Sequence, residues 1–326
     1  MKTSLVLILI FYVMSFLAAV FYVFSKKGEA ARFSSLALYA GLLLHTIILF
    51  YQGYLSGRLP VAGVFETLFF YSWAVSGVVA VVGWRYNERL SGLIMMPLSI
   101  TAFVFSFLNM TGPKKLPLIL RTYWFELHVI TSFAAYALFT LALSSAVFFI
   151  IRSYWQGRGT HPRGTHAEHG SGSEGTPSTT FVTKAGCIKK AFVSEVVLGA
   201  RDFLDITGRA ILFGFFFFSV SMFSGAIWGY VAWGAYWMWE PKMLWSFIVW
   251  FWYAGAMHLW YMKVTPRPTP LRGTHSESGS GAPKGGSGGI IERNGLWISV
   301  AAVMGFFITL FTYIGVGLLM KSSHSF

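Results

Sequence analysis

Long apolar runs dominate this chain of 326 residues, and they limit the folds that are open to it. A helix rises about 1.5 Å per residue, so roughly 20 apolar residues cross the hydrocarbon core of a bilayer, which is about 30 Å thick. Runs of that length lie at roughly 4–24, 36–53, 64–84, 91–109, 125–151, 209–227, 244–262 and 296–319. We therefore predict an all-α fold, a polytopic membrane bundle with about eight transmembrane helices.

The overall composition points to the same class. Hydrophobic residues make up 55% of the chain and charged residues only 11%, which is too few charges to cover a soluble domain. The first run lacks a small-residue cleavage site, so we expect it to be retained as a span; an uncleaved signal anchor is the alternative.

The positions of lysine and arginine indicate the orientation, because positively charged short loops tend to stay in the cytoplasm. If the N-terminus lies outside, most of the 25 lysines and arginines fall in inner segments. Both termini and the connection between the sixth and seventh runs then lie outside. Basic loops that face anionic lipid also explain the net charge of +13 without any nucleic-acid partner.

Two inner loops rich in Gly, Ser, Pro and Thr, at 157–180 and 266–289, predict flexible linkers. Residues 184–205 have helical apolar spacing, so this segment either lies along the inner membrane surface or belongs to the linker. The single cysteine, Cys187, excludes an internal disulfide. We divide the chain into helices one to five (1–156), a first linker (157–205), two helices with a Trp-rich connection (206–265), a second linker (266–292) and the last helix with its tail (293–326).

The connection between the sixth and seventh runs is unusually aromatic. The eighteen residues from Trp228 to Trp245 contain five tryptophans, whereas an aromatic belt at a bilayer surface needs only a few aromatic residues per helix end. So many rings would form a broad, flat, polarisable surface suited to a planar aromatic ligand, and haem is the obvious candidate. The residues expected to contact it are Trp228, Trp233, Tyr236, Trp237, Trp239 and Glu240.

Two histidines are expected on the same side as this aromatic segment. His128 stands at the outer start of the fifth run, and His324 follows the outer end of the eighth. Two neutral imidazoles can fill both axial positions of a haem iron, so we predict that this pair ligates haem. The alternative is that each histidine only contacts headgroups or forms a hydrogen bond at a helix end.

Two further histidines lie within the spans, where an imidazole is costly without a partner. His258 is about 14 residues into the seventh helix, roughly 21 Å from the outer connection, and His45 is in the second helix. They are candidate ligands of a second, membrane-embedded haem; otherwise each bonds a neighbouring helix. Glu66, near the outer start of the third helix, either orients a ligand histidine or the aromatic segment, or simply favours the helix dipole.

These residues resemble the WWD domain of haem-handling proteins, and in particular the CcsA family, also called ResC, of system II cytochrome c synthesis. The match runs through Gly225-Ala-Ile-Trp, the stretch from Ala232 to Lys242, Trp245 and His258. Similarity extends to Gly57-Arg-Leu-Pro, Phe65-Glu-Thr-Leu-Phe-Phe, Phe311-Thr-Tyr-Ile-Gly-Val and Ser323-His-Ser. The chain departs from the family where Glu240 replaces the usual Asp and Met243 a common Glu.

The resemblance implies a protein that takes haem across the membrane and presents it, reduced, to a c-type cytochrome precursor, whose Cys-x-x-Cys-His thiols add to the haem vinyl groups. It implies that His128 and His324 ligate an external haem. It also implies that His258 ligates a membrane haem opposite a residue of a ResB-like partner, with His45 as a less favoured substitute.

The resemblance further implies haem b as substrate and bound ligand, a thiol-reducing protein as another partner, and a bacterial cytoplasmic membrane location with the haem site on the extracytoplasmic side. The chain would be an enzyme as a subunit of a cytochrome c synthase, a haem lyase, with no single residue assigned as catalytic. Two alternatives stay open. One is a haem transporter or chaperone without ligation activity, and the other is a non-haem assembly factor of a respiratory complex.

Overall fold

The computed structural model describes residues 2–61, 63–86, 88–110, 120–157, 200–264 and 287–315. Within these ranges the long elements are all helices: α1 (Lys2–Ser25), α2 (Gly28–Ser56), α3 (Val64–Tyr86), α4 (Ser91–Leu108), α5 (Tyr123–Gly157), α7 (Ala200–Trp233), α8 (Pro241–Val264), α9 (Ser287–Leu310) and the π-helix η2 (Phe311–Gly315). Each predicted apolar run is found as a helix, so the all-α fold is confirmed.

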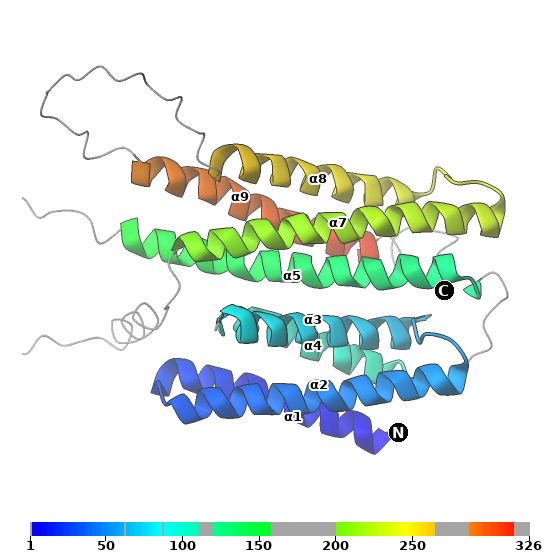
Figure 1. Cartoon of the computed structure of the whole chain (residues 1–326), viewed down its shortest axis with the longest axis horizontal. Coiled ribbons are helices and arrows are strands. Elements are labelled where there is room, and N and C mark those ends of the chain that lie inside the picture. Colours follow the sequence, from blue (N-terminus) through cyan, green and yellow to red (C-terminus); the bar gives the residue numbers. More distant parts are fainter. Residues whose placement is uncertain are drawn as a thin grey trace, which may run out of the picture.

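Seven helices in the described part of the chain are long and apolar enough to cross a membrane. The expected eighth, α8, is not among them although it has 24 residues. Its many tryptophan and tyrosine side chains, with one histidine, lower its mean hydropathy without shortening it. It packs against α7 and α9 along the bundle (Figure 1). The chain is a multi-pass membrane protein.

Several helices extend past the apolar runs that predicted them. α2 begins at Gly28, and α5 has 35 residues, about 52 Å, which is longer than the hydrocarbon core is thick. α7 begins at Ala200, so residues 200–205 form its first turns and not the end of a linker. α9 begins at Ser287, inside the predicted second linker. Residues 158–199, with Cys187, residues 265–286 and the tail with His324 lie outside the described residues.

The helices pack in pairs, and α5 stands at the centre (Figure 1). α1 packs on α2, α3 packs on α4, and α5 makes its most extensive contact with α7. A cluster of buried apolar side chains joins α5 to α7, α8 and α9; within it the rings of Phe139 and Tyr253 stack with centroids 3.6 Å apart. A second cluster, which includes Tyr12 and Phe103, lies mainly among α1 to α4.

Successive helices alternate in direction, so their connections gather at two ends of the bundle. The start of α1, the α2–α3 connection, the start of α5 and the α7–α8 connection lie at one end (Figure 1). η2 reaches the same region, because the ring of Phe311 lies 4.6 Å from that of Trp245 at the start of α8. We call residues 234–240, which join α7 to α8, the Trp loop, and this end of the bundle the Trp-loop end.

Candidate functional site

The Trp loop makes a tight reversal between α7 and α8. Gly234 adopts a left-handed conformation, with φ of 73°, which glycine tolerates without steric cost. Its N–H donates to the carbonyl oxygen of Tyr230 over 2.8 Å. Further along, the N–H of Met238 donates to the sulfur of Met243 over 3.3 Å. Met243, which departs from the family pattern, therefore helps to hold the loop against α8.

The tryptophan rings do not form one flat surface. Trp228 meets Trp233 at an interplanar angle of 68°, and Trp237 meets Trp239 at 90°. The expectation of a broad flat platform is therefore wrong, because aromatic rings that pack together favour edge-to-face contact. Trp228 is 3% exposed and belongs to the core, whereas Trp239 is 81% exposed.

The exposed rings of the Trp loop are those of Trp239 and Tyr236. Tyr236 stacks on Tyr230 of α7, with ring centroids 4.4 Å apart and an interplanar angle of 10°. Trp237 packs edge-on against Phe247 of α8, with centroids 4.5 Å apart. Packing on both helices thus holds the loop in place and leaves Trp239 facing outward.

Glu240 is the last residue of the Trp loop and is half-buried. Its carbonyl oxygen accepts the N–H of Leu244 over 3.1 Å, which is the first hydrogen bond of α8. The structure therefore places this predicted site residue at the helix start, between the exposed ring of Trp239 and the first turn of α8.

His128 lies in the second turn of α5, against α7. Its Nδ1 is 2.7 Å from the carbonyl oxygen of Ser221. A carbonyl oxygen only accepts, so Nδ1 carries the proton and Nε2 carries the lone pair that an iron ligand needs. Ring contacts lead from this region toward the Trp loop: Phe125 contacts Trp228, and Trp228 contacts Trp233, the last residue of α7, with centroids 5.2 and 4.8 Å apart.

The structure does not bring the two membrane histidines together. His258 is on an exposed face of α8, and its Nδ1 donates to the carbonyl oxygen of Ala254 in the same helix over 2.8 Å. His45 is fully buried in α2, where Nδ1 lies 2.9 Å from the hydroxyl of Tyr12 and the ring packs on Phe69. α2 and α8 lie on opposite sides of the bundle (Figure 1).

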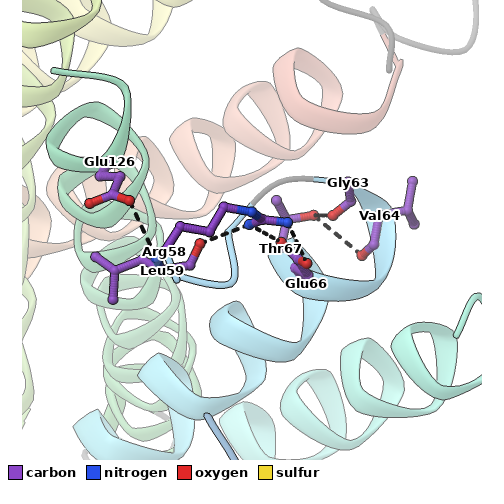
Figure 2. A network of polar contacts seen from close by, with 7 residues as sticks. All are labelled: Arg58, Leu59, Gly63, Val64, Glu66, Thr67 and Glu126. Carbon is purple, nitrogen blue, oxygen red and sulfur yellow. Dashed lines mark hydrogen bonds and ion pairs between the residues drawn. The ribbon is translucent and has the colours of Figure 1, made fainter. Parts of the chain in front are cut away.

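A second polar group lies at the Trp-loop end, shown in Figure 2. Arg58 donates to both carboxylate oxygens of Glu66, over 2.8 and 2.9 Å, and each side chain is 15% exposed. The N–H of Leu59 donates to Glu126 of α5 over 3.3 Å. This network ties the α2–α3 connection to α5 two residues before His128. Sequence reasoning did not predict that Arg58 is the partner of Glu66.

Sequence reasoning also missed the residues that surround His128. The hydroxyl of Ser221 lies 3.1 Å from Nδ1, and Ser132 bonds both Ser221 and the His128 carbonyl oxygen. Gly225 lies directly against the imidazole ring. The one available signal was that Gly225 stands in the segment that resembles the WWD domain.

Residues 61–268, more than half of the chain, match the family described as "Cytochrome C assembly protein". The chain belongs to this family. The matched range contains His128, His258 and the whole Trp loop, all of which are placed in the bundle described above. Membership agrees with the resemblance to CcsA that the aromatic segment and its histidines indicated.

Within the cytochrome c assembly family the chain is similar to proteins named "Cytochrome c biogenesis protein CcsA". The protein of that name from Porphyra purpurea is 24% identical over 283 residues, which cover 83% of this chain and 79% of the relative. The one from Gloeobacter violaceus is 30% identical over 225 residues, 61% of this chain and 66% of the relative.

A solved structure named "Cytochrome c Heme Lyase CcmF" has a similar fold. The TM-score is 0.60 with 12% sequence identity, and the match covers 98% of this chain and 46% of CcmF. At this identity the likeness concerns the fold alone. This member of the cytochrome c assembly family therefore spans about half the length of CcmF and shares its helical arrangement.

Proposed function

We propose that this chain binds haem b at the Trp-loop end and acts as the CcsA-like subunit of a cytochrome c synthase. In this role it delivers haem across the membrane for covalent attachment to the Cys-x-x-Cys-His motif of a c-type cytochrome precursor. The observation that carries the proposal is the setting of His128. Its Nδ1 proton is held by the carbonyl oxygen of Ser221, so Nε2 is the basic nitrogen. Ring contacts also run from Phe125, three residues before His128, through Trp228 to Trp233, which directly precedes the Trp loop.

His128 and His324 are the proposed axial ligands of the haem iron. His128 stands on α5, the central helix of the bundle, and its ring orientation is set by α7. The chain continues to His324 from η2, which contacts the start of α8 through Phe311 and Trp245. Both ligands would therefore approach from elements near the Trp loop. Trp239, being 81% exposed, is the ring best placed to pack against one edge of the macrocycle.

The attachment reaction is carried by haem and the precursor thiols. Each cysteine S–H adds across one vinyl C=C: the sulfur bonds one vinyl carbon, the hydrogen goes to the other, and no oxidant or reductant is consumed. A thiol-reducing protein would keep the precursor cysteines available. The chain contributes orientation, because holding thiol and vinyl group in contact replaces much of the entropy cost of a bimolecular encounter.

His258 is the proposed ligand of a second haem within the membrane. Its Nδ1 donates to Ala254, so the lone pair is on Nε2, and the residue lies on an exposed face of α8. A ligand on the opposite side of the iron would then come from outside this chain, which fits a ResB-like membrane partner. Leu244 and Phe251 are exposed on the same face of α8. This face extends about 21 Å along the helix axis, from His258 to Leu244 near the Trp loop.

We place the Trp-loop end on the extracytoplasmic side of a bacterial cytoplasmic membrane. The distribution of basic residues supports this orientation. In it, haem would pass from the site at His258 toward the Trp loop, where an exported precursor is accessible.

The function is tested by coexpression of the full chain with a ResB-like partner and a reporter c-type cytochrome, with attached haem measured by haem staining. We expect His128→Ala and His324→Ala each to abolish attachment, and added imidazole to restore part of it. His275→Ala, in the second linker, is the control and should leave the yield unchanged. Wild-type yield in both axial-ligand variants would overturn the assignment. Haem that copurifies with the wild-type chain but is never attached would favour a transporter or chaperone.

A further inference from the structure

The imidazole of His128 occupies a notch in α7 that exists because residue 225 is glycine. A methyl group in place of the Gly225 hydrogen would lie 2.6 Å from Nδ1 and 2.9 Å from Cε1 of His128. Neither distance is compatible with ordinary atomic contact. Any larger residue would therefore push the ring away from α7. The hydrogen bond from Nδ1 to the carbonyl oxygen of Ser221 would then be lengthened or lost.

Two serines complete the surroundings of the ring, and their hydrogen bonds run in one direction. Ser132 donates its only proton to the carbonyl oxygen of His128 over 2.7 Å. In the bond between the two hydroxyls, Ser221 must then be the donor. Its oxygen, 3.1 Å from Nδ1, is left to accept. Ser221 thus receives the Nδ1 proton at both its hydroxyl and its carbonyl oxygen.

Both serines are almost fully buried, at 1% exposure for Ser221 and 7% for Ser132. Water therefore does not readily replace either hydroxyl. The tautomer with the proton on Nδ1 is the one that satisfies every group in this arrangement, because the opposite tautomer would leave Nδ1 facing a carbonyl oxygen with no proton between them.

We propose that Gly225, Ser221 and Ser132 are positioning residues that orient His128 and hold it in the tautomer whose Nε2 binds the haem iron. The inference rests on the proposed function of His128 as an axial ligand. In a ligating histidine, the ring nitrogen that does not bind the metal donates a hydrogen bond that fixes the orientation of the ring and raises its basicity as a ligand. Loss of this hydrogen bond commonly lowers metal affinity about 10- to 100-fold.

The test compares three glycine variants of the full-length protein, all in a His258→Ala background so that only the haem at His128 contributes to the spectrum. Gly225→Ala should weaken haem binding about 10- to 100-fold. Gly214→Ala is the matched control for packing damage. Gly214 is also on α7, and a methyl group there would lie 2.5 Å from Phe139, a buried residue of α5 that is away from His128. Gly77→Ala in α3 is the neutral control, because no atom lies within 4 Å of such a methyl group. Binding is followed in the low-spin haem spectrum, with and without imidazole.

We expect Gly225→Ala to lose the low-spin spectrum and to regain it with imidazole. Gly214→Ala should lower thermal stability and keep the spectrum, and Gly77→Ala should change neither. If Gly225→Ala and Gly214→Ala lose haem equally and imidazole restores neither, the effect is general packing damage and the positioning role is refuted.

Ser221→Ala keeps the test decisive if Gly225→Ala does not fold. In haem-free protein, nitrogen NMR of labelled histidine should find the His128 proton on Nδ1 in the wild type and a measurable share on Nε2 in Ser221→Ala. A wild-type proton on Nε2 would overturn the inference. The function itself is judged separately: if His128→Ala loses the haem spectrum while Gly225→Ala and Ser221→Ala keep it, His128 is a ligand and these residues do not position it. If His128→Ala keeps it, both proposals fail.

Discussion

Nδ1 of His128 on α5 lies 2.7 Å from the carbonyl oxygen of Ser221 on α7, a residue 93 positions further along the chain. The two helices share the most extensive contact in the bundle, so the position of the histidine depends on how they pack. α7 also leads directly into the Trp loop. The same helix pair therefore sets the geometry of the proposed ligand and of the aromatic rings beside it.

The orientation of the chain can be tested by cysteine labelling. With Cys187→Ala as the background, we expect a membrane-impermeant maleimide added to intact cells to label Tyr236→Cys and Ser323→Cys but not Lys27→Cys. Tyr236 is 57% exposed in the Trp loop, and Lys27 is exposed between α1 and α2 at the other end of the bundle. Labelling that puts the Trp loop and the tail on opposite sides of the membrane would contradict the proposed haem site.

The ion pair between Arg58 and Glu66 should contribute to stability. Removing either partner leaves a largely buried charge without its two hydrogen bonds, so Arg58→Gln or Glu66→Gln should lower the free energy of unfolding in detergent by about 1–3 kcal/mol. The double variant should lose less than the sum of the two single losses, because the residues contact each other.

Lys27→Gln is the matched control for the ion pair, since Lys27 is an exposed cation at a different helix connection. It should have little effect on unfolding. Strictly additive losses in the double variant would mean that the Arg58–Glu66 contact does not stabilise the protein. Glu126 of α5 accepts the N–H of Leu59, the residue next to Arg58 in the α2–α3 connection. Loss of the Arg58–Glu66 ion pair should therefore also disturb α5 near His128, and we expect Arg58→Gln to reduce haem retention there.

Glu88, between α3 and α4, should make stability depend on pH. It is 4% exposed, and burial raises the pKa of its carboxyl group despite hydrogen bonds from Ser91 that lower it. The folded state therefore holds the proton more tightly than the unfolded state does. This contribution is fully present below the unfolded pKa of about 4.3 and is lost as pH rises through the folded pKa.

The measurement is the thermal unfolding midpoint of the wild type and of Glu88→Gln between pH 4 and pH 8. Glutamine resembles the protonated acid, so the variant should gain stability relative to the wild type as pH rises and then level off. A difference that stays constant across this range would show that the Glu88 carboxyl group is not responsible.

The two membrane histidines should differ in their roles: His258 should bind haem, whereas His45 should contribute to stability through its hydrogen bond with Tyr12. His258→Ala should remove the membrane haem and leave folding intact, because the side chain is exposed. Tyr12→Phe, which removes the hydrogen bond to His45, should lower the free energy of unfolding by about 1 kcal/mol and leave the haem content unchanged. Loss of haem in Tyr12→Phe with normal stability would instead mark His45 as part of a haem site.

The helices could be predicted because length and apolarity are local properties of each run. Their ends were less predictable, since α2 and α7 also include residues 28–35 and 200–208, where charged and polar residues interrupt the apolar ones. α8 was predicted from its apolar run at 244–262, although its aromatic side chains leave it outside the seven helices that are apolar enough to count as spans.

The contacts of the candidate site could not be predicted. The residue of α7 that faces His128 depends on the register between two helices, and no local pattern records that register. Ser221 is an ordinary serine in an apolar run until the packing places it next to the imidazole. Likewise, the flat surface expected from the tryptophan count was wrong because the rings pack on each other and on neighbouring helices.

The central claim is that His128 and His324 hold haem at the Trp-loop end, and the absorption spectrum of the purified full-length protein tests it most directly. His258→Ala serves as the background, so that only the outer site contributes. We predict a low-spin, bis-histidine haem spectrum that is lost in both His128→Ala and His324→Ala and returns with added imidazole. The same haem content and the same spectrum in both variants as in the background would contradict the claim.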